Sequence, residues 1–172
     1  MTRILPRRSG VGVLLVLIVS AACIGRARAG SFCSNGWWAD LMIGSYHIHP
    51  EKQFDEFNPG VGLECWFKSQ WALSGGYYRN SLDRPSFYAG AIWGPEFAHW
   101  GWFRLVAMGG IITGYNYGKF GIGGANNGTG PVLAPAAITQ FGRFAVNFIL
   151  IPPIPQDRLP FTVGFQAKYR FK

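Results

Sequence analysis

Apolar and polar residues alternate with a period of two along much of the chain. Over residues 161–171, FTVGFQAKYRF, every odd position holds an aromatic residue, valine or alanine, and every even position a polar, charged or small residue. Successive side chains of a β-strand point to opposite faces, so this alternation predicts a strand with one apolar face. Residues 144–150 and 59–67 repeat the pattern, with Cys65 on the apolar face and Glu64 on the opposite one.

The same pattern predicts eight strands, separated by connections that alternate between long and short. Bacterial outer-membrane barrels have an even number of antiparallel strands, short periplasmic turns and longer outer loops. The odd-numbered strands are therefore expected to run outward, and the longest connection, 116–130, is expected to be an outer loop. The predicted strands are 39–49, 59–68, 70–80, 86–96, 101–115, 131–141, 143–151 and 161–171.

The composition favours a membrane barrel over a soluble sandwich. Aromatic residues make up 16% of the chain and charged residues 14%. A soluble β-sandwich, the alternative, would need charged residues on the second face of its strands, where this chain has mainly Gly, Ala, Asn and Gln. Within lipid the backbone must satisfy its own hydrogen bonds, which leaves helices and closed barrels. The expected fold is an all-β, eight-stranded antiparallel transmembrane β-barrel, too narrow for a porin and able to hold one small or chain-like ligand.

Residues 1–29 have the pattern of a secretory signal peptide. The first ten residues contain three arginines and no acidic residue, residues 11–24 form an apolar run, and the segment ends in Ala-Arg-Ala. The apolar run is short for a membrane-spanning helix, which needs about 20 residues. Cleavage after Ala29 would leave an outer-membrane barrel domain of residues 30–172. A lipoprotein signal ending at Cys23 is the alternative.

Removal of the predicted leader changes the charge of the protein. The leader contains five of the 16 basic residues and none of the 8 acidic ones, so 11 basic residues remain and the net charge falls from +8 to +3. No basic stripe remains, which argues against nucleic acid as a partner. Cys33 and Cys65 can form a disulfide in an oxidising compartment. His47 and His49 have no cysteine or third histidine nearby, so no metal site is predicted.

Polar residues gather at the predicted outer ends of the first and third strands. These ends hold His47 and His49, and then Asn80 and Ser81. The stretch from residue 80 to 85, NSLDRP, is rich in turn-forming residues, so an ordinary hairpin connection is one interpretation. A group of chemically active side chains at the outer rim is the other.

Several stretches carry a resemblance to a known family. They are SYH at 45–47, NSLDRPSFYAGAIW at 80–93, GPVLAPAAITQFG at 130–142 and GRFAVNFILIPP at 142–153. In these stretches and their order, the chain resembles PagP, the outer-membrane lipid A palmitoyltransferase family, over roughly residues 39–172. The family moves a palmitoyl chain from a phospholipid to lipid A, with its catalytic cluster at the outer rim and the acyl chain inside the barrel.

The resemblance implies catalytic roles for His47, Asn80 and Ser81. His47 would act as the base, because the free pKa of histidine lies near neutrality, and Ser81 would orient the ester. The aspartate of the family is replaced by Asn80, which cannot hold the negative charge that stabilises an imidazolium. Asp83 would substitute if the loop folds back, and Asn80→Asp is expected to raise activity. The implied protein is a monomer without cofactor or metal that acts on phospholipid and lipid A.

The resemblance also implies residues that bind the substrate. Arg79 and Arg84 lie on either side of the polar stretch and would meet lipid phosphates. Pro131 and Pro135 would open a gap in the barrel wall, because proline cannot donate to the backbone ladder. Pro59 is expected simply to begin a strand.

The strand that follows Ser81 is expected to limit the length of the acyl chain. Alternation places Gly90 and Ile92 among its inward-facing residues, together with Ser86 and Tyr88. In the family the residue at the depth of Ile92 is glycine and forms the floor of the acyl pocket. A butyl side chain there raises the floor, which predicts a preference for chains of roughly twelve to fourteen carbons.

A second class of function remains open from the sequence. A small outer-membrane barrel without catalytic activity, which acts in adhesion or envelope integrity, has the same strand pattern.

The leader generates a prediction about processing. We expect the protein recovered from outer membranes to begin at Gly30, because Ala27 and Ala29 provide the small residues that signal peptidase requires. N-terminal sequencing would then read Gly-Ser-Phe. Recovery from the cytosol with Met1 intact would contradict the outer-membrane assignment.

Overall fold

The structure is a computed structural model that describes residues 32–124 and 127–172. The contact pattern separates residues 1–31 from residues 32–172, and only the second unit is described below. The signal peptide predicted for residues 1–29 lies outside the described residues, and its cleavage site stays a prediction.

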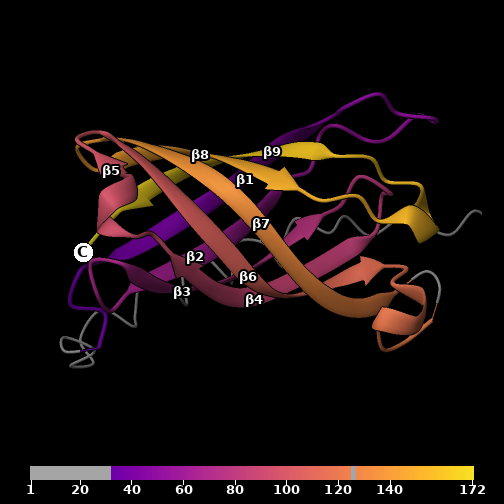
Figure 1. The fold of residues 1–172 in the computed structure, drawn as a ribbon, viewed down its shortest axis with the longest axis horizontal. Coiled ribbons are helices and arrows are strands. Elements are labelled where there is room, and N and C mark those ends of the chain that lie inside the picture. The colour runs from indigo at the N-terminus through magenta and orange to yellow at the C-terminus, as the bar shows by residue number, and fades with distance from the viewer. Residues whose placement is uncertain (1–31, 125–126) are drawn as a thin grey trace, which may run out of the picture. The chain divides into compact units, whose positions relative to one another are not determined.

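The second unit is a closed antiparallel barrel (Figure 1). Its strands pair in the order β4-β3-β2-β1-β9-β8-β7-β6, and β4 pairs with β6 to close the wall. β5 has two residues and pairs with β6 outside this ring. The wall therefore has eight strands, as the sequence predicts. The strands are β1 (Trp37–His47), β2 (Gly60–Trp66), β3 (Trp71–Arg79), β4 (Pro85–Trp93), β5 (His99–Trp100), β6 (Phe103–Tyr115), β7 (Gly128–Phe141), β8 (Phe144–Ile151) and β9 (Thr162–Arg170); three short 3₁₀ helices are η1 (Glu96–Ala98), η2 (Gly118–Phe120) and η3 (Pro155–Asp157).

Several observed strands differ from the predicted ranges, and the predicted strand 86–96 ends at Trp93. β1 begins earlier than predicted and ends at His47, before the predicted end at residue 49. The predicted strand 101–115 begins at Phe103, because a turn at Gly101 joins it to β5. β7 begins at Gly128, inside the predicted loop. In each case backbone pairing with a neighbouring strand decides the boundary, and the alternation pattern alone does not contain that information.

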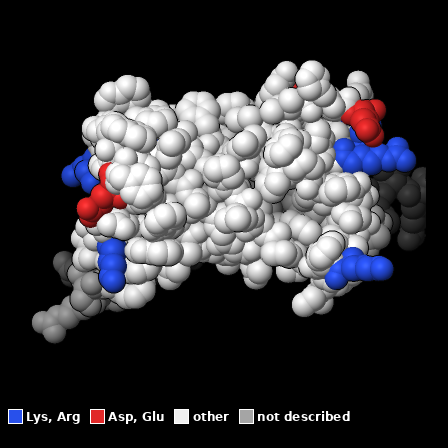
Figure 2. All heavy atoms as spheres, viewed as in Figure 1, with Lys and Arg blue, Asp and Glu red and all other residues white. Residues whose placement is uncertain are grey.

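The outward face of the barrel is an apolar belt. Figure 2 shows Lys, Arg, Asp and Glu side chains at the two ends of the molecule and none across the middle of this face. Exposed aromatic residues, among them Trp71, Trp93, Trp100 and Trp102, lie near the end with the short turns. An apolar band with aromatic residues at its borders is the surface that a transmembrane barrel presents to lipid. The protein is an outer-membrane β-barrel. The belt includes Leu41, Val61, Leu63, Leu73, Phe87, Leu105, Ile111, Leu133 and Phe148.

None of the helices in the described part of the chain has the length and apolar character needed to cross a bilayer.

Buried polar side chains pair with one another in the half of the lumen nearest the short turns. Lys168 donates from Nζ to Glu64 Oε2 at 2.5 Å, and Trp66 Nε1 donates to the same oxygen at 2.8 Å. Asn147 Nδ2 donates to Gln166 Oε1 at 2.9 Å. All five side chains are buried. Several inward positions that alternation predicts to be polar are therefore paired with one another across the narrow barrel.

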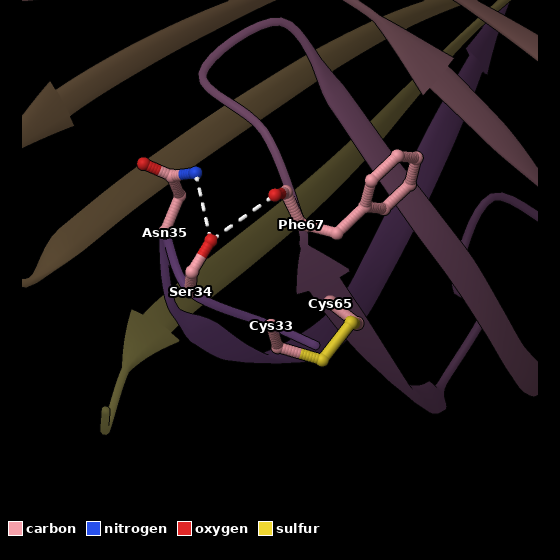
Figure 3. Close-up of a disulfide and its surroundings, with 5 residues drawn as sticks. All are labelled: Cys33, Ser34, Asn35, Cys65 and Phe67. Atoms are coloured by element: carbon pink, nitrogen blue, oxygen red, sulfur yellow. Dashed lines mark hydrogen bonds between the residues drawn. A yellow bond between two sulfur atoms is a disulfide. The ribbon is translucent and has the colours of Figure 1, made fainter. Parts of the chain in front are cut away.

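A disulfide joins the segment before β1 to the outside of β2 (Figure 3). Cys33 and Cys65 form the bridge that the cysteine count allows. Ser34 Oγ donates to the Phe67 carbonyl at 3.1 Å and so fixes the same turn against the β2–β3 connection. Cys65 lies on the outward side of its strand as predicted, but it is buried, because the segment that carries Cys33 covers it.

Candidate functional site

A β-bulge in β1 decides which side chains reach the interior at the outer rim. The register with β9 shifts between Met42 and Gly44, which leaves Ile43 as an extra residue. An extra residue reverses the alternation from that point on. Ser45 and His47 consequently face inward, while Tyr46 faces out. Without the bulge the inward side chain would be Tyr46.

The connection between β1 and β2, residues 48–59, folds back over the rim. Ser45 donates its backbone N–H to the Glu56 carbonyl at 2.9 Å, and Asp55 donates its N–H to the Ser81 carbonyl at 3.0 Å. At Gly44 the loop passes so close that a Cβ atom would lie 2.4 Å from the Glu56 oxygen. The loop therefore links β1 to the β3–β4 turn.

These contacts assemble a polar group that we call the rim cluster: Ser45, Asn58 and Ser81. Ser45 Oγ donates to Asn58 Oδ1 at 2.5 Å and lies 3.2 Å from Ser81 Oγ. Asn58 Nδ2 donates to the Asp55 carbonyl at 3.2 Å, which fixes the direction of its amide. Asn58 and Ser81 are buried. The cluster provides two hydroxyls and one amide, with Ser45 within hydrogen-bonding distance of the other two.

His47 lies at the same rim but is held by stacking. Its ring lies 4.6 Å from the ring of Phe54, with 14° between the planes, and the side chain is 3% exposed. Neither ring nitrogen has a hydrogen-bond partner among the described residues. The structure thus brings Ser81 to Ser45, but no described hydrogen bond joins His47 to Asn80 or Ser81.

His49 does not continue the strand that carries His47. The predicted strand 39–49 would place both rings on one face, two residues apart. That expectation is wrong, because β1 ends at His47 and His49 adopts a left-handed backbone with φ of 51°. His49 is exposed, as a solvated histidine would be.

Asn80 is saturated by hydrogen bonds within its own turn. Its Nδ2 donates to Ser86 Oγ at 2.9 Å and to the Gly114 carbonyl at 3.0 Å. Its Oδ1 accepts the backbone N–H of Leu82 at 2.9 Å and of Arg84 at 3.1 Å. The side chain is completely buried. Asn80 therefore fixes the turn that carries Ser81 and ties it to β4 and β6.

The charged residues of this turn pair on its outer side. Arg79 donates to both carboxylate oxygens of Asp83, and this hydrogen bonding holds the pKa of Asp83 below its usual value. Because both side chains are exposed, the pair contributes little stability. Arg84 Nη1 lies 3.5 Å from Asp157 Oδ1, in the connection between β8 and β9. The Asp83 carboxylate is thus bound to Arg79, and no described contact brings it to His47.

A cavity of about 130 Å³ lies beneath the rim cluster. All three members of the cluster line it, and the remaining lining is largely apolar. The space exists because several inward positions at this level are glycine, among them Gly110 and Gly164. A Cβ at Gly164 would meet only ordinary van der Waals contacts, so the cavity extends to the backbone there.

Gly90 and Ile92 both line this cavity. The burial of β4 alternates as predicted, with Ser86 and Ile92 buried and Phe87 exposed. Ile92 is 1% exposed and belongs to the apolar cluster at the inner end of the cavity. Gly90 has a second constraint, because a Cβ there would lie 2.3 Å from the Gly109 carbonyl of β6.

Pro131 and Pro135 lie in the part of β7 that has no backbone pairing with β8. β7 pairs with β8 only from Ala136–Ile149 to the turn, so both prolines lack a β8 partner. Gln140 donates its N–H to Trp102, on the β6 side of β7. The backbone N–H and carbonyl groups of successive residues point to opposite sides of a strand. In β7, those of the odd-numbered residues therefore point toward β8. The missing N–H groups of the two prolines are therefore on the side that is unpaired.

Sequence reasoning missed two members of the rim cluster. Ser45 was not selected, because the bulge at Ile43 that turns it inward has no signature in the alternation pattern. Asn58 lies in the predicted loop 50–58, where its position before Pro59 favours an extended backbone but does not indicate a partner. Phe54, which stacks on His47, also lies in this predicted loop, and its sequence position does not indicate a partner.

Among the described residues, no group of three or more His, Cys, Asp or Glu side chains is arranged to hold a metal ion.

Comparison with known proteins supports nothing finer than the architecture. No protein-family model matches the chain, and no curated protein does. A similar solved structure is that of the Yersinia pestis outer membrane protein Ail, with 16% identity, a TM-score of 0.39, and coverage of 79% of this chain and 99% of Ail. A likeness at this level carries no functional argument.

The saturation of Asn80 predicts a structural cost for its replacement. Asn80→Ala should lower the free energy of unfolding by about 2–4 kcal/mol, because it leaves buried backbone groups without partners. Asn80→Asp should also lower the free energy of unfolding, because a carboxylate oxygen would face the Gly114 carbonyl. This loss of stability opposes the gain in activity that the resemblance implies. Urea unfolding in detergent, followed by tryptophan fluorescence, measures both. Asn116→Ala removes one exposed turn hydrogen bond and should cost less than about 1 kcal/mol; an equal cost for the two alanine variants would contradict the assignment.

Proposed function

We propose that the protein is an outer-membrane acyltransferase that moves an acyl chain from an outer-leaflet phospholipid to lipid A. One observation carries the proposal: a largely apolar cavity inside the barrel opens at a buried cluster of two hydroxyls and an amide. An acyl ester has the matching shape, an apolar chain with a polar carbonyl at one end. The resemblance to the PagP family, noted from the sequence, supports the same assignment.

The contrast between the two halves of the lumen supports a hydrocarbon ligand. The half near the short turns contains paired polar groups such as Lys168 and Glu64. The half near the long loops is lined by glycine, alanine, methionine and isoleucine, with space between them. A polar ligand would lose its hydration in that half and gain few partners on a largely apolar lining, whereas each buried methylene contributes about 0.8 kcal/mol.

The rim residues have the groups that the reaction needs. The acceptor hydroxyl of lipid A attacks the ester carbonyl, a new ester bond forms, and the bond to the phospholipid glycerol oxygen breaks. The attacking hydroxyl loses a proton to His47, which returns it to the departing glycerol oxygen. The Ser81 hydroxyl donates to the carbonyl oxygen as that oxygen gains charge, while Ser45 stays hydrogen-bonded to Asn58 and holds its place beside Ser81. Asn80 acts as a positioning residue that holds the turn of Ser81.

The wall and the outer turn supply routes for the substrates in this proposal. The unpaired stretch of β7 at Pro131 and Pro135 is a place for a lipid chain to pass between leaflet and cavity. Arg79 is exposed at the rim, and in this proposal its guanidinium exchanges Asp83 for a lipid phosphate. Arg84 lies in the same turn with Asp157 as its partner, and its positive charge attracts the phosphate toward the rim.

A non-catalytic barrel, acting in envelope integrity or adhesion, is the second candidate. A specific observation favours it: among the described residues no carboxylate is hydrogen-bonded to His47, and Asn80 is fully engaged by its turn. A histidine without an orienting partner is a weak general base in the structure as it stands.

Lipid A mass distinguishes the two candidates. Expression of the protein should add the mass of one acyl chain to lipid A, and His47→Ala or Ser81→Ala should reduce that product by two or more orders of magnitude, because each removes a catalytic group. The measurement is mass spectrometry of lipid A from cells with folded protein in the outer membrane. His49→Ala is the matched control and should retain most of the product, since His49 is exposed and lies outside the strand. Unchanged lipid A with a folded, surface-facing barrel would support the non-catalytic candidate.

The floor of the cavity predicts the chain length. Wild type should prefer chains of roughly twelve to fourteen carbons, and Ile92→Ala should shift the preference upward by about two carbons, because it lowers the inner end of the cavity. Transfer from phospholipids of defined chain length measures the preference. Ile112→Ala is the control, because Ile112 lines the cavity nearer the rim and should leave the preferred length unchanged. A wild-type preference for sixteen carbons would show that Ile92 does not limit the chain.

A further inference from the structure

A second cavity lies at the opposite end of the barrel, among the short turns. Its volume is about 210 Å³, larger than that of the cavity beneath the rim cluster. Side chains of Arg104, Lys168 and Arg170 line it, together with Trp38 and Trp66. Within residues 32–124 and 127–172, no Asp or Glu belongs to its lining. In an outer-membrane barrel the short-turn end faces the periplasm, so this cavity is the periplasmic mouth of the lumen.

Two of the three cations at this mouth are not neutralised. Lys168 is paired with Glu64 at 2.5 Å, and Asp40 is a further buried carboxylate inward of the mouth. Among the described residues, neither Arg104 nor Arg170 has a carboxylate within salt-bridge distance. Arg104 Nη1 donates one hydrogen bond, to the Ser69 carbonyl at 3.2 Å. Most of the donors of these two guanidiniums are therefore available to a ligand.

The two guanidiniums are held in place by aromatic rings. Arg104 Cζ lies 5.0 Å from the ring centroid of Trp66, and Arg170 Cζ lies 5.6 Å from that of Trp38. Both tryptophans are buried. Stacking positions a guanidinium without cancelling its charge. A half-buried, positioned and uncompensated pair of guanidiniums is the arrangement that binds phosphate or carboxylate with two parallel hydrogen bonds.

We propose that the periplasmic mouth of the barrel is an anion site in which Arg104 and Arg170 bind a phosphate group. The phosphate comes from one of two sources that share this chemistry, a soluble phosphate or the headgroup of an inner-leaflet phospholipid. The exposed rings of Trp100 and Trp102 place the mouth near the depth of lipid headgroups. The site is independent of the rim cluster and of the acyltransferase proposal.

The test uses the full barrel purified in a neutral maltoside detergent. Inorganic phosphate is titrated while the tryptophan fluorescence of the barrel, to which Trp38 and Trp66 contribute, is followed. Wild type should show a saturable change, and Arg104→Gln combined with Arg170→Gln should weaken the apparent affinity at least about tenfold, because charge-assisted hydrogen bonds are lost. Arg143→Gln is the matched control: Arg143 is exposed in the β7–β8 turn at the same end and is not part of the lining.

A second variant keeps the test decisive if the double variant does not fold. Gln140→Glu is nearly isosteric and adds a carboxylate to the lining of the cavity, so it should weaken phosphate binding while both arginines remain. The resistance of each barrel to unfolding in sodium dodecyl sulfate shows that it is folded.

Nanodiscs distinguish the two sources of phosphate. If a headgroup is the ligand, phosphatidylglycerol should raise the midpoint of thermal unfolding relative to phosphatidylcholine alone, in wild type and Arg143→Gln but not in Gln140→Glu. If soluble phosphate is the ligand, the lipid should have no such effect, and phosphate in solution should raise the midpoint with the same dependence on Gln140. The proposal is overturned if Gln140→Glu responds to both ligands as wild type does, or if wild type responds to neither.

Discussion

The closure of the wall between β4 and β6 is the constraint on which the rest of the structure depends. A bilayer core offers no partners to a backbone N–H or carbonyl, so an open sheet edge there would leave a row of unsatisfied groups. The pairing of Tyr88–Trp93 with Ala107–Ile112 removes that edge. It also demands very close approach, because Gly90 and Gly110 each lie against backbone atoms of the opposite strand. Closure on eight strands then leaves a narrow interior, where every inward side chain meets others.

The narrow interior is divided between two kinds of filling. Near the short turns, charged and amide groups satisfy each other across the lumen, as Lys168 and Glu64 do. A buried ion pair is costly to dehydrate and is retained only with further hydrogen bonds, which Trp66 supplies to the shared oxygen. Toward the long loops, glycines replace these groups and the side chains no longer fill the space. The same barrel therefore has a rigid, polar plug in one half and an apolar cavity in the other.

The rim shows how small backbone irregularities determine chemistry. One extra residue at Ile43 turns Ser45 and His47 inward, and the returning loop then adds Asn58 and Phe54. Asn80 makes the adjoining turn rigid without contributing a free polar atom to the rim. Rigid support of this kind places a reactive group accurately, and it also limits what Asn80 itself is able to do.

Much of the fold could be predicted from the sequence by itself. The two-residue period determined the number of wall strands and the face of nearly every residue in β2, β4, β8 and β9, because alternation is a local property of extended backbone. It also determined that Ile92 faces inward, and the cysteine count allowed the bridge from Cys33. These features depend on near neighbours in the sequence, which the pattern records directly.

The tertiary structure alone decided the composition of the site. Ser45 meets Asn58 and Ser81, which are 13 and 36 residues away in the sequence. Asn80 reaches Gly114, 34 residues on, and this contact makes it an anchor of its turn. A bulge, a returning loop and strand closure set these meetings, and each depends on long-range pairing that single-residue chemistry and periodicity do not encode.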